Sequence, residues 1–413
     1  MIDTITIKTD LTEKLFNTLK DLKFGTYEYI DKNKKKHYIP SLLDDLKANA
    51  KQGKEEDMFL GLQKITIDDK GSKSKNHHIR RQHGYSLSIT ISIANVLKED
   101  FEGEKIDHLT ILSAKEIKKY SKLIQENISL KLMSYCFRFF FSNKVDLMNH
   151  SLNHEYGNNS IQIIQELDRY RIDRVDYCCS IETVDAAEYI KLLKAGDKPN
   201  QGSPKFEDFK EEGSLYLSSS GYNINFYNKQ QQLTYKQTEK KDKSITDEVL
   251  SEAENIIRIE IQYHRDKIRK KINTKSFFGE LEEVFSNENL EQAKSDILYV
   301  YDKIAHKGNY YKREKLRTII NQEFNSEPTR KKMYELIELV NTHPKKRGIR
   351  AVRELLKKGQ LNSSLFKTQK NITDIIAKFD EHKINVVCLE DNYNRKILLN
   401  LENDIRRVLY KDW

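Results

Sequence analysis

Two carboxylates lie on strand-like segments in the middle of the chain, where they could hold a metal ion. Side chains alternate between the two faces of a strand, so RIDRVDYC presents Asp173 on one face with Arg171 and Val175. The opposite face of this segment carries Ile172, Arg174 and Asp176. In ENIIRIEIQYH the alternation gives a core face of isoleucines and a polar face that contains Glu260 and His264.

A tyrosine and a lysine share one face of a third segment of this kind. Alternation along YNINFYNK places Tyr227 and Lys229 together, opposite Ile224 and Phe226. If the three segments form neighbouring strands, the two carboxylates, the tyrosine and the lysine reach one surface.

This combination suits the transfer of a phosphodiester to a tyrosine. Carboxylate oxygens bind hard divalent cations such as Mg²⁺ or Mn²⁺, and the cation would polarise a phosphate that Tyr227 attacks. The ammonium of Lys229 would favour the phenolate or neutralise charge in the transition state. The products would be a phosphotyrosine link and a free 3′-hydroxyl. Tyr227 and Lys229 are the candidate catalytic residues, and Asp173 and Glu260 are the candidate metal ligands.

Each of these residue types also has an ordinary structural use. An acid on the polar face of a strand is often solvated or paired with an arginine, and Arg171 and Arg258 are available partners. A tyrosine in a strand more often packs than acts as a nucleophile, especially in a chain with 22 tyrosines. Tyr222 is an alternative nucleophile. The histidines of HHIRRQH lack the spacing that puts two imidazoles on one strand face, which favours a basic DNA-facing loop over a metal site.

The composition allows a polyanionic partner without requiring one. The 413 residues include 72 Lys and Arg against 63 Asp and Glu, a formal net charge of +9. Four cysteines without a CxxC pair argue against a zinc or disulfide framework. The apolar stretch at residues 130–141 is interrupted by Lys131 and Arg138 and is too short to span a bilayer. With no apolar signal core at the start, we expect a cytoplasmic protein without a membrane partner.

The spacing of apolar residues predicts the elements that would position these side chains. Strands are expected at residues 4–8, 85–97, 170–182, 214–218, 222–229 and 256–264. Helices are expected at residues 12–22, 113–128 and 185–195, with a charged loop at 236–251 and a helical pattern from about 265 to 379. This order predicts an α+β domain with a mostly antiparallel sheet, followed by a helical domain.

At these residues the chain resembles the phage and plasmid initiators of rolling-circle replication. The resemblance is to the filamentous-phage nicking-protein type, which is related to plasmid trans-acting Rep initiators and some relaxases. It covers residues 1–275 and rests on four segments in order. They are MIDTITIK, YRIDRVDYC with the helix DAAEYIKLLK, GSLYLSSSGYNINFYNKQQQL, and ENIIRIEIQYHRDKI.

The resemblance implies a ferredoxin- or RRM-like sheet and a metal-dependent, site-specific nick that leaves a tyrosine on the 5′-phosphate. It assigns the nucleophile to Tyr227, its neighbour to Lys229, and the metal ligands to Asp173 and Glu260. The chain departs from this family in the spacing of Asp176 after RID. It also lacks the His-hydrophobe-His motif of the histidine-bearing nickases.

A basic helical hairpin is expected near the C-terminus. The segment KKRGIRAVRELLKK carries seven basic residues and one acid around an apolar stripe. A turn, a second helical pattern and a strand-like NVVCL follow, as in a helix-turn-helix or winged-helix reader of DNA; a hairpin with a solvated basic face is the alternative. The candidate DNA-binding residues are Arg265, Lys267, Arg269, Lys270, Lys345, Lys346, Arg347, Arg350, Lys367 and Lys370.

Together these patterns predict a nicking domain at residues 1–275, a helical connector at 276–335 and an all-helical or winged-helix DNA-binding domain at 336–413. The expected function is that of a rolling-circle replication initiator. Its cofactor would be Mg²⁺ or Mn²⁺, its substrate origin DNA, and its further partner a host helicase. A relaxase with the same chemistry, a non-catalytic DNA-binding regulator and a single-stranded RNA-binding protein are the alternatives.

Overall fold

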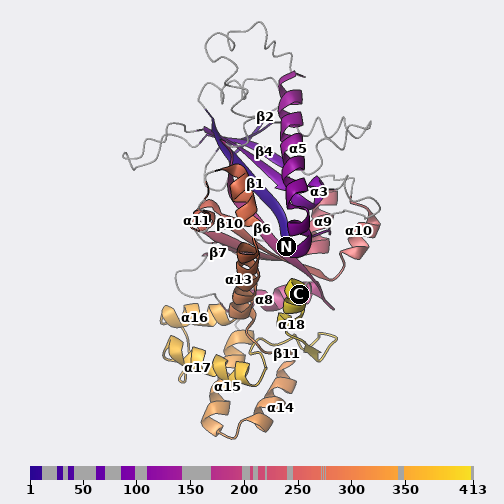
Figure 1. Cartoon of the computed structure of the whole chain (residues 1–413). Helices are drawn as coiled ribbons and strands as arrows, with labels where there is room; N and C mark the ends of the chain where they lie inside the picture. Colours follow the sequence, from indigo (N-terminus) through magenta and orange to yellow (C-terminus); the bar gives the residue numbers. More distant parts are fainter. Residues whose placement is uncertain are drawn as a thin grey trace. The chain divides into compact units, whose positions relative to one another are not determined.

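The structure of the chain, drawn in Figure 1, is a computed structural model. It divides into two compact units. It describes residues 1–11, 26–30, 36–40, 62–69, 85–97, 109–141, 169–197, 205–207, 213–218, 221–239, 245–270, 272, 274, 276–342 and 348–410. Unit 1 comprises residues 1–178 and 262–291, and unit 2 comprises residues 179–261 and 292–413. The chain passes between the units within β6 (Arg171–Glu182), β10 (Ile256–His264) and α13 (Asn287–Ala305).

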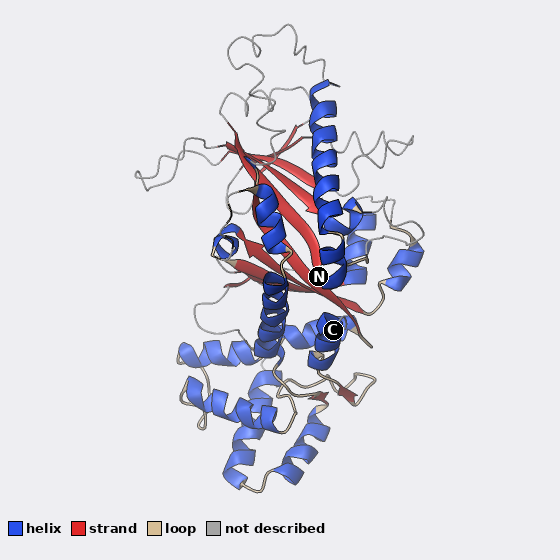
Figure 2. Ribbon diagram, in the orientation of Figure 1, coloured by secondary structure: helices blue, strands red, loops and turns tan. Residues whose placement is uncertain are grey.

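Unit 1 contains an antiparallel sheet with strands in the order β2-β3-β4-β5-β1-β6. Strands are drawn in red in Figure 2. The strands are β1 (Ile2–Leu11), β2 (Thr26–Ile30), β3 (Lys36–Pro40), β4 (Leu62–Asp69), β5 (Tyr85–Ser92) and the first part of β6. Ile5 and Ile7 of β1 are fully buried and define the core face. Their partners on the neighbouring strands are also buried and apolar, namely Ile89, Ile91, Ile172 and Val175.

An irregularity in β6 changes the faces that strict alternation predicts. Val175 pairs with Ile5, and Ile172 pairs with Ile7, so the register skips Asp173. Partners in a pair lie on one face of the sheet, and therefore Ile172 and Val175 share the core face. The prediction that they lie on opposite faces was wrong, because an extra residue at a β-bulge breaks the period of two.

Five helices described in unit 1 accompany this sheet. They are α3 (Ile93–Val96), α4 (Ala114–Lys119), α5 (Ser121–Phe141), α11 (Arg265–Arg269) and α12 (Phe277–Val284). The predicted start of a helix at Ser113 is confirmed, since Ser113 and Glu116 form a capping box at α4. Helix α12 contacts α5, and its Val284 carbonyl accepts a hydrogen bond from the Tyr177 hydroxyl.

Unit 2 contains strands in the order β10-β9-β8-β7, with β7 (Lys205–Glu207), β8 (Ser214–Ser218) and β9 (Tyr222–Asn228) paired antiparallel. One face of β8, β9 and β10 is the core. Its side chains are at most 3% exposed and comprise Leu215, Leu217, Ile224, Phe226, Ile257, Ile259 and Ile261. The isoleucine face predicted for residues 256–264 is thus confirmed.

The helices described in unit 2 include α8 (Ala186–Lys194), α9 (Lys229–Thr238) and α10 (Asp247–Glu252). Five more follow the unit 2 part of α13, namely α14 (Arg313–Glu323), α15 (Glu327–Thr342), α16 (Ile349–Lys357), α17 (Gln369–Glu381) and α18 (Glu402–Tyr410). A short antiparallel pair joins β11 (Tyr310–Tyr311) to β12 (Ile397–Leu398).

The predicted α+β class with an antiparallel sheet is confirmed. Three local predictions were wrong. The strand expected at residues 85–97 ends at Ser92, and residues 93–96 form α3 instead. The expected loop at residues 236–251 contains the end of α9 and the start of α10, and NVVCL makes a single bridge at Leu389 rather than a strand. The helix expected at residues 12–22 and the histidines of HHIRRQH lie outside the described residues. The predicted domain boundaries near residues 275 and 335 stay a prediction.

Candidate functional site

Tyr227 and Glu260 meet inside unit 2. Tyr227 lies near the end of β9, Glu260 lies in β10, and the Tyr227 hydroxyl donates a hydrogen bond to Glu260 Oε2 at 3.3 Å. Both side chains are buried, with 4% and 8% of their surface exposed. A carboxylate that accepts a hydrogen bond from a phenol can also accept its proton, so the pair has the geometry of a nucleophile beside a base.

Alternation along the strands puts Tyr227 and Glu260 on the same side of the sheet. Alternation sends Ile224 and Phe226 of β9 and the isoleucines of β10 to the core. Tyr227 and Glu260 therefore belong to the opposite, polar side. This polar sheet face of unit 2 consists of Ser214, Tyr216, Ser218, Asn223, Asn225, Tyr227, Arg258 and Glu260.

Arg258 is also part of the polar sheet face. Its side chain is 1% exposed, and Nε donates to Ser180 Oγ at 2.9 Å. Such pairing is what a buried guanidinium requires, because an unpaired buried charge is strongly destabilising.

Lys229 does not share a strand face with Tyr227, so that prediction was wrong. Strand β9 ends at Asn228, whose side chain accepts a hydrogen bond from the Gln231 amide and caps α9. Lys229 is the first residue of this helix and is buried, and its ammonium donates to Gln232 Oε1 at 3.0 Å. An Asn followed three residues later by Gln is a helix-start signal, and it could have revealed this boundary in the sequence.

Tyr222, the alternative nucleophile, is in a different environment. It has the strand parity of Ile224 and Phe226 rather than that of Tyr227. Burial raises the pKa of its phenol, and Asp296 and Tyr299 raise it further. These effects disfavour the phenolate at Tyr222.

Asp173 lies in unit 1, whereas Tyr227, Lys229 and Glu260 lie in unit 2. At the bulge in β6 its carboxylate is partly exposed and 4.0 Å from the Lys8 ammonium. Asp176 is buried instead, and it accepts hydrogen bonds from Thr4 and from Arg174 Nη2, the latter at 2.8 Å. Nearby, burial and then Arg174 lower the pKa of His264, against a smaller opposing effect of Asp173.

Within the described part of the chain, no cluster of three or more His, Cys, Asp or Glu side chains could hold a metal ion. Mg²⁺ in phosphoryl-transfer sites often uses one or two carboxylates together with substrate phosphates and water. Glu260 has the oxygen chemistry for one such ligand, and Asp173 has it in the other unit.

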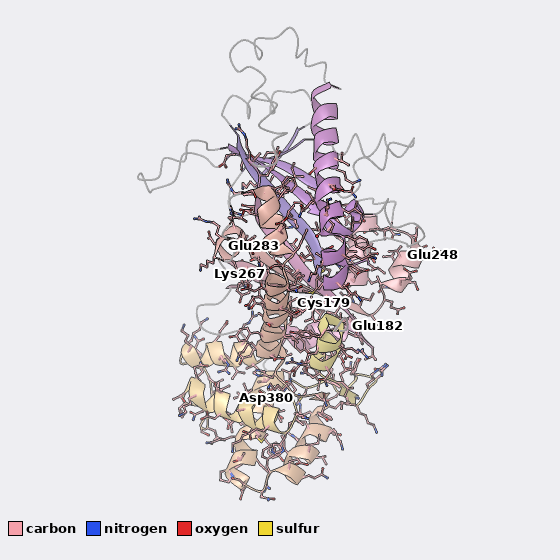
Figure 3. The ribbon with its side chains drawn as sticks, in the orientation of Figure 1. Cys179, Glu182, Glu248, Lys267, Glu283 and Asp380 are labelled. Atoms are coloured by element: carbon pink, nitrogen blue, oxygen red, sulfur yellow. The ribbon has the colours of Figure 1, made fainter. Side chains whose placement is uncertain are left out.

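The four basic residues predicted to bind DNA around α11 differ in their contacts and in their exposure. Arg265 is tied to Glu280 of α12 by contacts of 2.6 and 2.8 Å, and Glu280 is buried. The ammonium of Lys267, labelled in Figure 3, lies 3.9 Å from the centre of the Tyr263 ring. Arg269 and Lys270 are exposed and remain available to a polyanion.

The C-terminal basic residues divide in a similar way. Lys367 and Lys370 are exposed near the start of α17, and Arg350 is half-buried in α16. Lys345, Lys346 and Arg347 lie outside the described residues.

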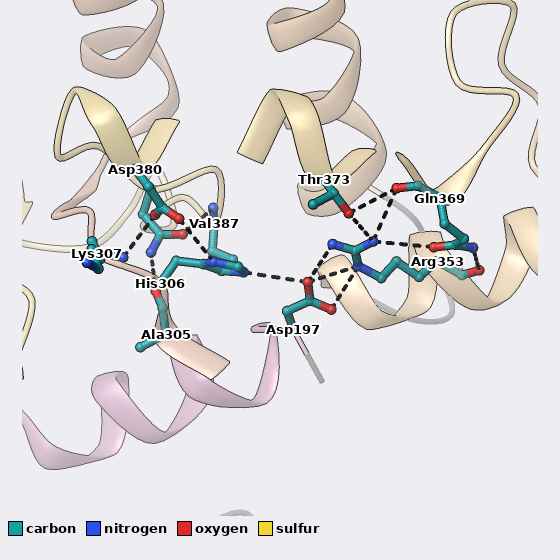
Figure 4. A network of polar contacts seen from close by, with 10 residues as sticks. Asp197, Ala305, His306, Lys307, Arg353, Gln369, Thr373, Asp380 and Val387 are labelled. Atoms are coloured by element: carbon teal, nitrogen blue, oxygen red, sulfur yellow. Dashed lines mark hydrogen bonds and ion pairs between the residues drawn. The ribbon is translucent and has the colours of Figure 1, made fainter. Parts of the chain in front are cut away.

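Arg353, from the same basic segment, points into a network within unit 2 (Figure 4). It contacts both carboxylate oxygens of Asp197 at 2.8 to 2.9 Å, and its Nη1 donates to Thr373 Oγ1 at 3.2 Å. His306 lies between Asp197 and Asp380, at 3.6 and 3.4 Å. The sequence offered no signal for this network, because its members are scattered from residue 197 to residue 380.

Comparison with protein-family models matches no family, and comparison with curated proteins finds no matching relative. Among the helices described here, none combines the length and apolar character needed to cross a membrane.

Proposed function

We propose that this chain nicks one strand of DNA through Tyr227 and acts as a rolling-circle replication initiator in the cytoplasm. The hydrogen bond from Tyr227 to Glu260 is the observation that carries the proposal. A phenol that donates a hydrogen bond to a carboxylate has the base beside it that activates a nucleophile.

In the proposed step, Tyr227 Oη attacks the scissile phosphorus while its proton passes to Glu260. A bond forms between the phenol oxygen and phosphorus, and the bond between phosphorus and the 3′-oxygen breaks. The leaving oxygen takes a proton from solvent and becomes a 3′-hydroxyl. Because one phosphodiester replaces another, the same step in reverse can rejoin the strand.

The proposed metal would be Mg²⁺ or Mn²⁺. Glu260 of unit 2 would supply a carboxylate oxygen to it, and the ligand role of Asp173 in unit 1 stays a prediction. When bound, the metal would supply positive charge to the non-bridging oxygens of the phosphate. Lys229 follows Tyr227 by two residues and lies in the first turn of α9. A catalytic role for its ammonium is part of the proposal.

For the rest of the chain, the proposal includes a ferredoxin- or RRM-like nicking domain and a winged-helix or helix-turn-helix reader at residues 336–413. The exposed lysines Lys367 and Lys370 near the start of α17 support a DNA-contacting surface there. A tethered reader would raise the effective concentration of the nick site at Tyr227. A conjugative relaxase would use the same chemistry on a transfer origin.

The test is to incubate the purified chain with Mg²⁺ or Mn²⁺ and a supercoiled library of its native replicon. We expect a nicked product with covalently attached protein. Tyr227→Phe should abolish the adduct, and Glu260→Gln should slow its formation by about 10²- to 10⁴-fold, the usual loss when a general base is removed. Tyr222→Phe is the matched control and should form the adduct normally. Salt-sensitive DNA binding with no adduct under either metal would favour a non-catalytic regulator.

A further inference from the structure

A tyrosine and an asparagine flank Tyr227 on the polar sheet face of unit 2. Tyr216 of β8 and Asn225 of β9 are direct partners in the antiparallel register, and Ser214 is the partner of Tyr227. Asn225 precedes Tyr227 by two residues, so the two side chains emerge about 7 Å apart on one face. Tyr216 is then the diagonal neighbour of Tyr227, a relation within reach of an aromatic side chain.

Tyr216 is not needed to fill the core. Its neighbours in β8, Leu215 and Leu217, supply the core face and are at most 3% exposed. Tyr216 itself is half-buried on the polar side. A partly exposed ring on a sheet surface can stack against an unpaired base, whichever base it is.

Asn225 supplies a hydrogen-bonding group beside this ring. Its side chain is half-buried, and within the described part of the chain its buried Oδ1 atom accepts no hydrogen bond. A buried acceptor without a donor destabilises a fold, so rotation of this half-buried side chain toward a ligand that supplies the donor would be favoured. The amide also has an NH₂ donor, and this donor–acceptor pair matches the N6 amino group and N7 of adenine.

We propose that Tyr216 and Asn225 form a subsite for one unpaired nucleobase of single-stranded DNA, with adenine preferred. Tyr216 stacks on the base, and Asn225 accepts a hydrogen bond from the amino group and donates one to the ring nitrogen. The subsite rests on the proposed function in one respect: the bound nucleotide would adjoin the phosphate that Tyr227 attacks. It can nevertheless be measured as binding, without any nicking.

The experiment uses the full chain with EDTA and fluorescein-labelled octanucleotides of deoxyadenylate and thymidylate, read by fluorescence anisotropy. We expect the adenine oligonucleotide to bind about 5- to 100-fold more tightly, as one bidentate base contact allows. Asn225→Ala should remove this preference and leave thymidylate binding within about twofold. Tyr216→Leu should weaken both oligonucleotides by about 5- to 100-fold, the effect of losing one stacked base.

Two variants keep these outcomes interpretable. Tyr216→Phe retains the ring and should bind nearly as tightly as the unmodified chain. Tyr235→Leu removes another tyrosine, which is 51% exposed on α9, and should leave binding unchanged. Melting curves by circular dichroism identify any variant that fails to fold.

Equal affinity of the unmodified chain for both oligonucleotides would overturn the subsite, and so would tight binding by a folded Tyr216→Leu variant. Tighter binding of octariboadenylate than of its DNA counterpart would also contradict it, because the site would then suit RNA. If any of these three results accompanies a Tyr227-dependent covalent adduct, the subsite fails and the nicking function stands. If the chain neither binds single strands nor forms an adduct, both proposals fail.

Discussion

The ion pairs around His306 lead to a prediction about stability and pH. Burial lowers the pKa of His306, but the carboxylates of Asp197 and Asp380, 3.6 and 3.4 Å from its ring nitrogens, outweigh this effect and raise the pKa to about 9. The imidazole is therefore protonated at neutral pH. His306, just after α13, contacts Asp197 after α8 and Asp380 of α17. Arg353 of α16 contacts Asp197 and Thr373 of α17.

His306→Asn removes this charge with little disturbance of the backbone. His306 has a φ of 57°, a left-handed conformation that asparagine adopts more readily than most residues. A pKa of about 9 in the folded chain, against 6.5 for an unperturbed histidine, corresponds to about 3 kcal/mol of stability. Because the folded-state pKa is raised, this stability is fully present below pH 6.5 and disappears as the pH rises through 9.

The assay is urea unfolding at pH 6, 8 and 10, followed by circular dichroism. We expect His306→Asn to lose about 3 kcal/mol relative to the unmodified chain at pH 6 and much less at pH 10. Lys383→Asn is the matched control, since Lys383 is exposed and has a φ of 54°. An equal loss at all three pH values would refute the reasoning, because the effect would then come from packing rather than from charge.

Three further predictions concern other parts of the chain. Glu280→Gln should destabilise the chain by about 3 kcal/mol, since Glu280 is buried and accepts hydrogen bonds from Arg265 and from the Ile172 amide. Thermal unfolding compares this variant with the exposed control Glu282→Gln. Equal melting temperatures of the two variants would contradict the prediction. Gly348→Ala should cost about 1–3 kcal/mol, because φ is 122° and a Cβ would lie 2.6 Å from the Ala195 carbonyl oxygen. Its control, Gly359→Ala, has a φ of 67° and open space, so a similar cost in urea unfolding would argue against the close contact. Arg269→Ala and Lys370→Ala should each lower the salt dependence of DNA binding by about one counterion without changing stability, and an unchanged slope would remove the residue from the DNA-binding surface.

Local patterns predicted the elements of the sheet well. The strands at residues 214–218 and 256–264 match β8 and β10, because each has an unbroken alternation with one apolar face. The helix start at Asp185 was equally readable, since its side chain accepts a hydrogen bond from the Glu188 amide.

Features that depend on a partner strand or on distant residues could not be read in this way. The bulge at Asp173 is set by how β6 pairs with β1, so alternation within β6 alone gave the wrong faces. The ion pairs of Arg353 join residues 156 positions apart, whereas its basic neighbours suggested a DNA-binding or solvated surface. For the candidate site, sequence alternation predicted Tyr227 on the polar side of the sheet, whereas its contact with Glu260 required the structure.

The most direct test of the proposed function is to map the covalent adduct. After reaction with the native replicon and Mn²⁺, the DNA is digested and the attached peptide is fragmented in a mass spectrometer. We expect a phosphonucleotide on Tyr227, at a fragment position that separates it from Tyr222. Attachment at Tyr222 would contradict the assignment of the nucleophile, and the absence of any attached nucleotide would contradict the nicking function itself.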